Sequence, residues 1–142
     1  MIKNLSIFLD KNTRTITGLQ SFALLAARLW IAKIFFMSGL TKIKSWPTTV
    51  SLFEQEYNVP LLPPELAAYM STTAELSLPI FLALGFITPL AAIGLMGMTL
   101  VIELFVYPGT AEHYYWLLLL GVIATHGSGQ FGIDYLIRRK YL

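Results

Sequence analysis

The sequence predicts an all-α fold: an integral membrane four-helix bundle with a short amphipathic helix in its first external loop. The first observation is composition, because 56% of the 142 residues are hydrophobic and only 13% are charged, about half the charge of a soluble domain. The second is the length of the apolar runs, which favour helices because barrel strands alternate polar and apolar residues. The chain has the size of one domain, and we expect a single membrane domain over residues 1–142.

The first two predicted spans enclose a long loop. The first span is predicted at about 19–43, where an apolar run of about 22 residues is long enough to cross a bilayer core. The second, at about 64–84, begins at a proline pair, Pro63 and Pro64, and a helix start tolerates the missing N–H groups. In the loop, residues 47–57 predict a short amphipathic helix that carries Val50, Phe53 and Tyr57 on one face.

Two further spans are predicted in the second half of the chain. The third covers about 88–107 and ends before Pro108 and Gly109. The fourth covers about 114–126 or somewhat beyond, and a glycine-rich stretch at 127–129 interrupts it. Basic residues precede the first span and follow the last: Lys3, Lys11, Arg14, Arg138, Arg139 and Lys140. Because cytoplasmic segments carry an excess of Lys and Arg, we expect a multi-pass protein with both termini cytoplasmic.

Four charged residues lie inside the apolar runs: Arg28, Lys33, Glu75 and Glu103. Each would cost several kcal/mol if it faced lipid alone, so all four are expected to face the bundle interior, to pair with each other or to line a wet cavity. At a helical rise of about 1.5 Å per residue, Arg28 and Glu75 both fall near the membrane midplane. Lys33 and Glu103 both fall about 21 Å from the cytoplasmic side by the same rise. We therefore expect two pairs, which either hold the bundle in register or form a polar site for a ligand, a proton or a quinone head group.

Several cofactor classes are excluded by residue counts. The chain has no cysteine, so it has no thiolate metal site and no cysteine-ligated iron–sulfur cluster. His113 and His126 would lie about 20 Å apart along one helix, so they cannot ligate the same haem iron. We expect no covalently bound cofactor and no metal, although one histidine with Glu103 or Glu112 is a minor alternative. The net charge of +2 gives no reason to expect a nucleic-acid partner.

The order and spacing of several short motifs resemble the DoxX family over about residues 24–137. The first part of the signature is Arg28, Phe35, Ser38, Gly39 and Lys42. The second part is Ala74, Glu75, Pro79, Leu82, Gly85, Thr88, Ala91 and Ala92. The last third contributes Val106, Tyr107, Pro108, His113, Trp116, Gly127, Gly129 and Asp134.

The resemblance implies a small four-helix protein of the bacterial cytoplasmic (inner) membrane. Relatives include subunits associated with quinol oxidase and thiosulfate:quinone oxidoreductase, so it also implies an accessory or quinone-interacting subunit of a membrane oxidoreductase, with quinone as the candidate cofactor. Besides the lipid bilayer, the expected partners are other oxidoreductase subunits or further copies of the chain. Two alternatives stay open: a small transporter, channel or proton pathway, and a non-catalytic membrane assembly factor.

The family pattern also separates the two predicted pairs. Arg28 and Glu75 match the pattern, so they are the favoured ligand or proton site. Lys33 and Glu103 depart from it together, which favours an ion pair specific to this chain. Further lining of the site is expected from Ser38, Ser71 and Thr72, and additional candidates are Lys42, His113, His126 and Asp134.

Overall fold

The computed structural model describes the backbone of residues 2–141 and the side chains of residues 17–141. Within this part of the chain the secondary structure is helical, without a strand, as the sequence predicts. The elements are α1 (Ile2–Lys44), α2 (Trp46–Leu52), the π-helical η1 (Phe53–Tyr57), α3 (Pro64–Leu84), α4 (Thr88–Val101), the π-helical η2 (Ile102–Val106), α5 (Ala111–His126) and α6 (Ile133–Tyr141).

Three helical segments are long and apolar enough to cross a membrane: Thr17–Lys44, Pro64–Leu84 and Thr88–Val106. These three agree with the first three predicted spans. The fourth predicted span corresponds to α5, which has 16 residues. This length is below the roughly 20 residues that a transmembrane helix usually needs, so the fourth span stays a prediction.

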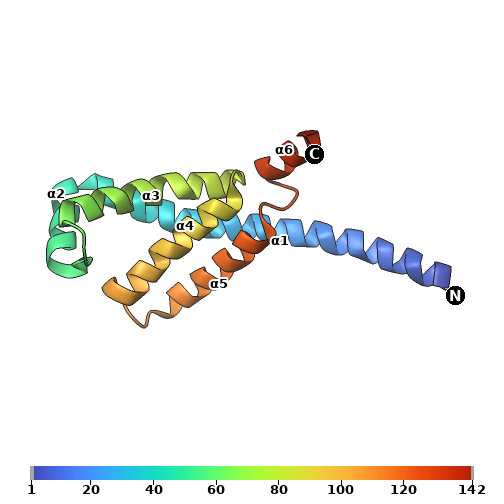
Figure 1. The fold of residues 1–142 in the computed structure, drawn as a ribbon, viewed down its shortest axis with the longest axis horizontal. Helices are drawn as coiled ribbons and strands as arrows, with labels where there is room; N and C mark the ends of the chain where they lie inside the picture. Colours follow the sequence, from blue (N-terminus) through green and yellow to red (C-terminus); the bar gives the residue numbers. More distant parts are fainter. Residues whose placement is uncertain (1, 142) are drawn as a thin grey trace.

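Helix α1 is much longer than the span predicted within it. The sequence predicts a span from about residue 19, whereas the helix begins at Ile2. Residues 2–17 contain neither glycine nor proline, so nothing in this polar stretch breaks the helix. The N-terminal part of α1 consequently extends past the other helices of the bundle (Figure 1).

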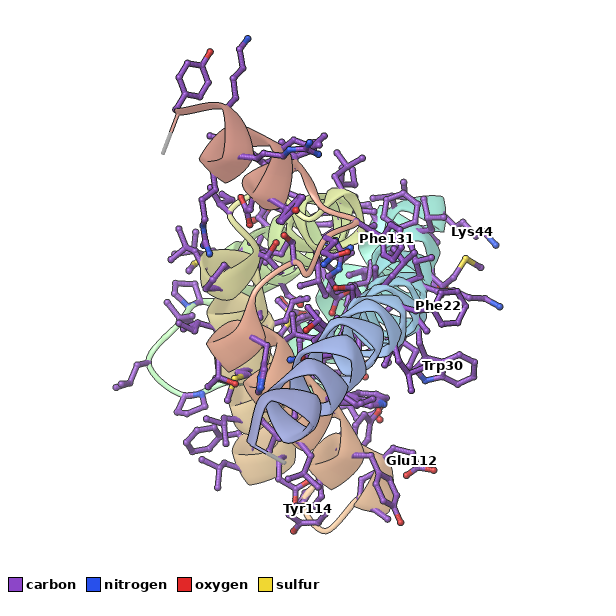
Figure 2. All side chains as sticks on the ribbon, turned by 90° about the vertical axis from the view of Figure 1, so that its right-hand side faces the viewer. Phe22, Trp30, Lys44, Glu112, Tyr114 and Phe131 are labelled. Atoms are coloured by element: carbon purple, nitrogen blue, oxygen red, sulfur yellow. The ribbon has the colours of Figure 1, made fainter. Side chains whose placement is uncertain are left out.

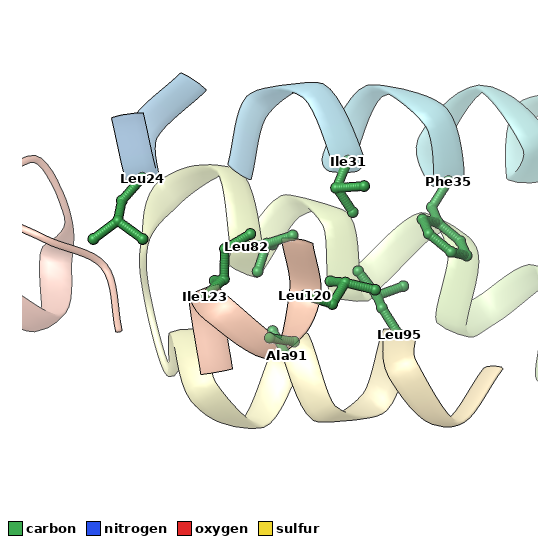
Figure 3. Close-up of a cluster of buried hydrophobic side chains, with 9 residues drawn as sticks. Leu24, Ile31, Phe35, Leu82, Ala91, Leu95, Leu120 and Ile123 are labelled. Atoms are coloured by element: carbon green, nitrogen blue, oxygen red, sulfur yellow. The ribbon is translucent and has the colours of Figure 1, made fainter. Parts of the chain in front are cut away.

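The helices form two closely packed antiparallel pairs, α1 with α3 and α4 with α5, and α4 follows α3 through a tight turn (Figure 1). Side chains from all four helices meet in one apolar core, which Figure 3 shows from the side. Its buried members are Leu24, Ile31, Phe35, Leu82, Ala91, Ala92, Leu95, Leu120 and Ile123. This core holds the four helices together between two polar clusters, one at each end.

The polar cluster at the turn between α3 and α4 is organised by Arg28, which is fully buried. Its Nη1 donates to the carbonyl oxygens of Leu82 (3.1 Å) and Ala83 (3.3 Å), and its Nη2 donates to that of Phe131 (3.2 Å). The last carbonyls of a helix have no partner within the helix and carry partial negative charge. Arg28 therefore caps the C-terminus of α3 and fixes it to the segment that precedes α6.

Asp134 performs the complementary task at the start of α4. Its two carboxylate oxygens accept hydrogen bonds from the backbone N–H groups of Ile87 and Thr88, each at 2.8 Å. A carboxylate at a helix N-terminus satisfies the unpaired N–H groups and complements the helix dipole. The backbone N–H of Asp134 also donates to the carbonyl of Gly85 at 2.8 Å. The turn between α3 and α4 is thus clamped from both sides.

Gly85 in this turn should be intolerant of a side chain. Its φ is +67°, and an added Cβ would collide with the guanidinium of Arg28 and lie 2.6 Å from Cα of Gly132. We expect Gly85→Ala to lower the free energy of unfolding in detergent micelles by about 2–4 kcal/mol, from the left-handed backbone and the overpacking together. Gly97→Ala is the matched control, since nothing lies within 4 Å of its added Cβ. Equal stability of the two variants would contradict the assigned role of Gly85.

Candidate functional site

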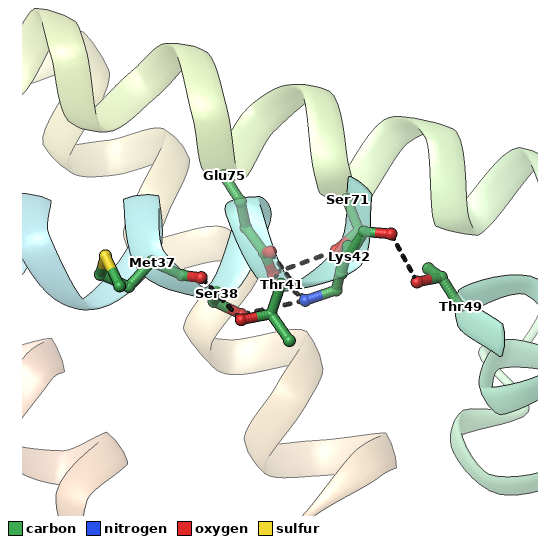
Figure 4. Close-up of polar contacts among 7 residues, drawn as sticks. All are labelled: Met37, Ser38, Thr41, Lys42, Thr49, Ser71 and Glu75. Atoms are coloured by element: carbon green, nitrogen blue, oxygen red, sulfur yellow. Dashed lines mark hydrogen bonds and ion pairs between the residues drawn. The ribbon is translucent and has the colours of Figure 1, made fainter. Parts of the chain in front are cut away.

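The second polar cluster contains a lysine–glutamate ion pair between α1 and α3. Nζ of Lys42 lies 2.7 Å from Oε2 and 3.0 Å from Oε1 of Glu75 (Figure 4). The third donor position of the ammonium is used by Oγ of Ser38, at 3.0 Å. Oγ of Ser71 donates to Oε1 of Glu75 at 3.3 Å. Because the side chain of Glu75 is 3% exposed and that of Lys42 is 15% exposed, this pair is largely withdrawn from solvent.

Helical spacing explains how these four side chains meet. Ser38 and Lys42 are four residues apart on α1, and Ser71 and Glu75 are four residues apart on α3, so each couple shares one helix face. Gly39 allows the two helices to approach closely, since an added Cβ would lie 2.9 Å from the Leu76 side chain and 3.1 Å from that of Glu75. The site therefore depends on a small residue in α1 beside the charged ones.

The loop after α1 is attached to this cluster through Thr49. Its buried hydroxyl donates to the backbone carbonyl of Lys42 at 2.8 Å, which fixes α2 against the end of α1 (Figure 4). Phe53, the first residue of η1, is also buried and packs against Ala67 and Ala68 of α3. These contacts place η1 beside the ion pair.

A cavity of about 460 Å³ lies next to the ion pair, between α1, α3, α4, α5 and the two π-helical segments. Its polar lining comes from Ser38, Lys42, Ser71, Glu75, Tyr57, Tyr107, His113 and Trp116. The remaining lining is apolar and includes Ile34, Phe35, Phe53, Val59, Leu62, Met70, Met98, Val101, Ile102 and Val106. The ion pair thus faces a predominantly hydrophobic space, where an electrostatic interaction is stronger than in water.

His113 belongs to the cavity lining and is held by Glu103 of η2. Nδ1 of His113 lies 2.7 Å from Oε2 of Glu103, while Oε1 accepts from the backbone N–H of Gly109 (2.7 Å) and the hydroxyl of Tyr114 (2.9 Å). A carboxylate has no hydrogen to donate, so Nδ1 carries the hydrogen of this contact. Among the described residues no other hydrogen bond engages the imidazole ring, which leaves Nε2 to interact with a ligand.

The π-helical segments meet at the same end of the bundle. The Tyr107 hydroxyl donates to Oε1 of Glu56 in η1 at 2.5 Å, and the rings of Tyr57 and Tyr107 pack edge to face at 5.8 Å. The hydrogen bond to the Glu56 carboxylate raises the pKa of the Tyr107 phenol, which therefore keeps its proton and remains a donor. π-Helical turns occur frequently at functional sites, and here both contribute residues to the cavity wall.

The predicted pairing of Arg28 with Glu75 is wrong. Arg28 binds the carbonyls at the end of α3, and Glu75 binds Lys42 instead. Arg28 lies at the level of Leu82, whose carbonyl it binds. Leu82 is seven residues from Glu75, or about 10 Å along α3. A depth counted from the start of the apolar run places Arg28 too close to the middle of the bundle, because α1 continues past the end of α3.

The predicted pairing of Lys33 with Glu103 is also wrong. Lys33 is exposed on the outer side of α1. The carboxylate of Glu103 is directed to His113, Gly109 and Tyr114. Both residues were expected to face the bundle interior, but only Glu103 does. Equal counted depth on two helices did not bring them together, because depth gives no information about the direction in which a residue faces.

The remaining candidates divide between the two polar clusters. Ser38, Ser71, Lys42 and His113 lie at the cavity. Asp134 and His126 lie at the opposite end, where they line a second cavity of about 500 Å³. Thr72 is buried in α3 but lines neither cavity, and its hydroxyl has no partner among the described residues. No three histidine or acidic side chains within residues 17–141 are grouped so that they could hold a metal ion.

Some cavity residues were not foreseen from the sequence. Lys42 is among the additional candidates of the sequence analysis, but its pairing with Glu75 is not predicted there. Its spacing of four residues from Ser38 is the signal that indicates a shared polar face on α1. Val59 and Leu62 come from the loop before α3, and Trp116 comes from α5. No local pattern links these residues to Glu75, since only the folded loop brings them to it.

These features define a small, all-helical membrane protein with an apolar cavity beside a buried ion pair. The family model for DoxX matches residues 23–108, which is more than half of the chain. The protein therefore belongs to the DoxX family, as the motifs indicated. No curated protein and no solved structure matches the chain.

The ion pair can be tested by a double-mutant cycle. Lys42→Met leaves the buried Glu75 carboxylate without its counter-charge, and we expect a loss of about 3–5 kcal/mol in the free energy of unfolding. Lys42→Met combined with Glu75→Leu should cost much less, because no uncompensated charge remains. Lys44→Met, at an exposed position of the same helix end, is the control and should change stability little. Additive effects of the two single substitutions in detergent unfolding would show that the pair is not coupled.

Proposed function

We propose that the cavity binds a quinone or quinol, and that the protein is an accessory or quinone-interacting subunit of a membrane oxidoreductase system. The observation that carries this proposal is the composition of the cavity. Its lining is mostly apolar, and the Lys42–Glu75 pair and His113 face it from different helices. A hydrophobic ring compound with a few polar oxygens matches such a lining.

The residues present fit this class of ligand. A volume of about 460 Å³ lies within the range of small-molecule sites, roughly 300–1,000 Å³. The hydroxyl of Ser38, which accepts from Lys42, would donate its own hydrogen to a carbonyl oxygen, and the Glu75 carboxylate would accept from a ring hydroxyl. A bound quinone would supply reversible redox chemistry that couples electrons to protons. The chain itself contributes orientation, exclusion of water and sites that hold protons.

His113 is the residue best suited to exchange a proton with such a ligand. An imidazole can donate a hydrogen from one ring nitrogen and accept one at the other, and the partner of one ring nitrogen determines which nitrogen is free. Here Glu103 holds Nδ1, so Nε2 is the position at which a ring hydroxyl would bind. The carboxylate also stabilises the positive charge when the imidazole takes up a proton. His113 can therefore accept a proton without leaving its place.

The transport alternative has less support. A proton or solute pathway would have to connect the two polar clusters. Between them lies the apolar core, in which Ile31, Leu82 and Leu95 are fully buried. A pathway would therefore have to pass these buried apolar side chains. A purely structural assembly role would account for the Lys42–Glu75 pair but not for Nε2 of His113, which no hydrogen bond within residues 17–141 engages.

Ligand binding can be tested with decylubiquinone as the probe. In wild-type protein we expect a rise in thermal stability with probe concentration, equivalent to about 2.7 kcal/mol at a hundredfold excess over Kd. Ala74→Phe, which fills the cavity, should abolish the rise. Ala26→Phe, at an exposed position of α1, should preserve it. If both variants respond alike, or if the wild type does not respond, the cavity is not a quinone site.

We also propose four spans, with α5 as the fourth, in a bacterial inner membrane, and both termini in the cytoplasm. The excess of basic residues at both chain ends supports this orientation. Exposed tyrosines at the other end of the bundle support a membrane–water interface there, as in an aromatic belt: Tyr69, Tyr107, Tyr114 and Tyr115.

Fusions to alkaline phosphatase, which is active only outside the cytoplasm, can test this topology. A fusion after Tyr57 should be active, because the loop between α1 and α3 is placed outside. A fusion after Leu142 should be inactive but should show full activity with a cytoplasmic reporter such as green fluorescent protein. An active phosphatase at the C-terminus would mean that the number of spans is odd or that the orientation is reversed.

A further inference from the structure

The cavity beside the ion pair has its mouth between α3 and the end of α4. Most of its lining is buried or half-buried, and the lining residues that are also exposed are Leu62, Met70, Val101 and Tyr107. A residue that belongs both to the cavity wall and to the outer surface marks the rim of an opening. Leu62 precedes α3 and Met70 lies in its second turn, while Val101 and Tyr107 flank η2. The mouth is therefore a slit between these two segments.

Helix α1 forms the back of the cavity and not its mouth. It contributes Ser38 and Lys42 to the lining, and both of these residues are half-buried. The outward-facing side chains of this helix, such as Phe22 and Trp30 (Figure 2), do not line the cavity. The polar groups that α1 supplies consequently lie on the inner wall.

Helices α3 and α4 diverge from their common turn, and the slit lies where they are farther apart (Figure 1). Near the turn they pack closely, since an added Cβ at Gly94 would lie 2.8 Å from the Leu78 side chain. Met70 lies eight residues from Leu78, and Val101 lies seven residues from Gly94. Both are therefore about 10–12 Å farther from the turn than this close contact. Met70 and Val101 thus lie on opposite sides of the slit at a similar height.

The inner part of the slit faces the hydrocarbon of the bilayer. Both of its walls belong to segments that are long and apolar enough to cross a membrane, Pro64–Leu84 and Thr88–Val106. Met70 and Val101 lie about 8–9 Å along the helix from the nearer ends of these segments. Toward the water side, η1 and η2 are joined by the hydrogen bond from Tyr107 to Glu56. A ligand that passes between Met70 and Val101 therefore comes from the membrane.

We propose that the quinone enters its site from the bilayer through the slit, and that its hydrocarbon tail stays between Met70 and Val101. This inference rests on the proposed function and narrows the ligand to a quinone with a long apolar tail. The tail has apolar surroundings on both sides of the rim, so it loses no hydrophobic contact where it leaves the cavity. The unbranched side chain of methionine also adapts to irregular apolar gaps. The ring, which carries the polar oxygens, is left to the wall that holds Ser38 and Glu75.

A photoreactive quinone tests where the tail lies. The probe is a ubiquinone analogue with a diazirine on its decyl tail, and the protein is held in phosphatidylcholine nanodiscs. We expect mass spectrometry to locate the label at Met70 or Val101, and we expect an excess of decylubiquinone to suppress it. Leu104, which is 65% exposed in η2 and outside the cavity lining, is the control. A label there comes from probe dissolved in the lipid, so decylubiquinone should not suppress it.

A blocked slit tests the route of entry. Because the chain has no cysteine, Val101→Cys offers a single thiol, to which N-cyclohexylmaleimide adds a bulky ring. The modified variant should need about ten times more decylubiquinone for the same rise in thermal stability, since the added ring takes the space of the tail. The unmodified variant should respond like the wild type. The same modification of Leu104→Cys should leave the response unchanged.

The slit and the quinone site can fail separately. If the wild type responds to decylubiquinone but the label at the slit is not suppressed, the route through the slit is overturned and the quinone site is not. Equal responses of the two modified variants would overturn the route in the same way. A wild type that does not respond to decylubiquinone would overturn both.

Discussion

Every charge that this chain carries into the membrane needs a partner, and this constraint determines where the helices are fixed to one another. Arg28 is satisfied by the carbonyls at the end of α3 and by the segment before α6. Glu75 is satisfied by Lys42 across the α1–α3 contact. Each interaction joins elements that are far apart in the sequence. Because an unpaired charge in lipid costs several kcal/mol, each also excludes alternative registers of the helices.

The same constraint creates the candidate site. A lysine–glutamate pair needs hydrogen bonds for its remaining donors and acceptors, and Ser38 and Ser71 supply them. These hydrogen bonds complete the polar contacts of the pair, and no side chain fills the space beside it. An apolar cavity with one polar wall therefore remains. The π-helical segments carry Tyr107 and Glu56 toward each other at this end. Charge neutralisation and packing of the loop therefore leave an apolar cavity with a polar wall at this end of the bundle.

Two faces of helix α1 carry polar side chains. One face carries Ser38 and Lys42 toward the cavity, and the other carries Trp30 and Lys33 outward. The helix that contributes to the candidate site is therefore also exposed on the outside of the bundle.

The sequence by itself determined the helical class, the three long apolar helices, the charges that lie within them and the membership of the DoxX family. Hydropathy and the spacing of residues along the chain suffice for these, because none of them depends on how the helices pack. The pairing of the charges was decided only by the tertiary structure. The apolar run of α1 begins nine residues before Arg28, or about 13 Å, whereas α3 ends at the level of Arg28. Counting along either helix cannot reveal this offset, nor that Lys33 faces outward, since both depend on how the helices pack.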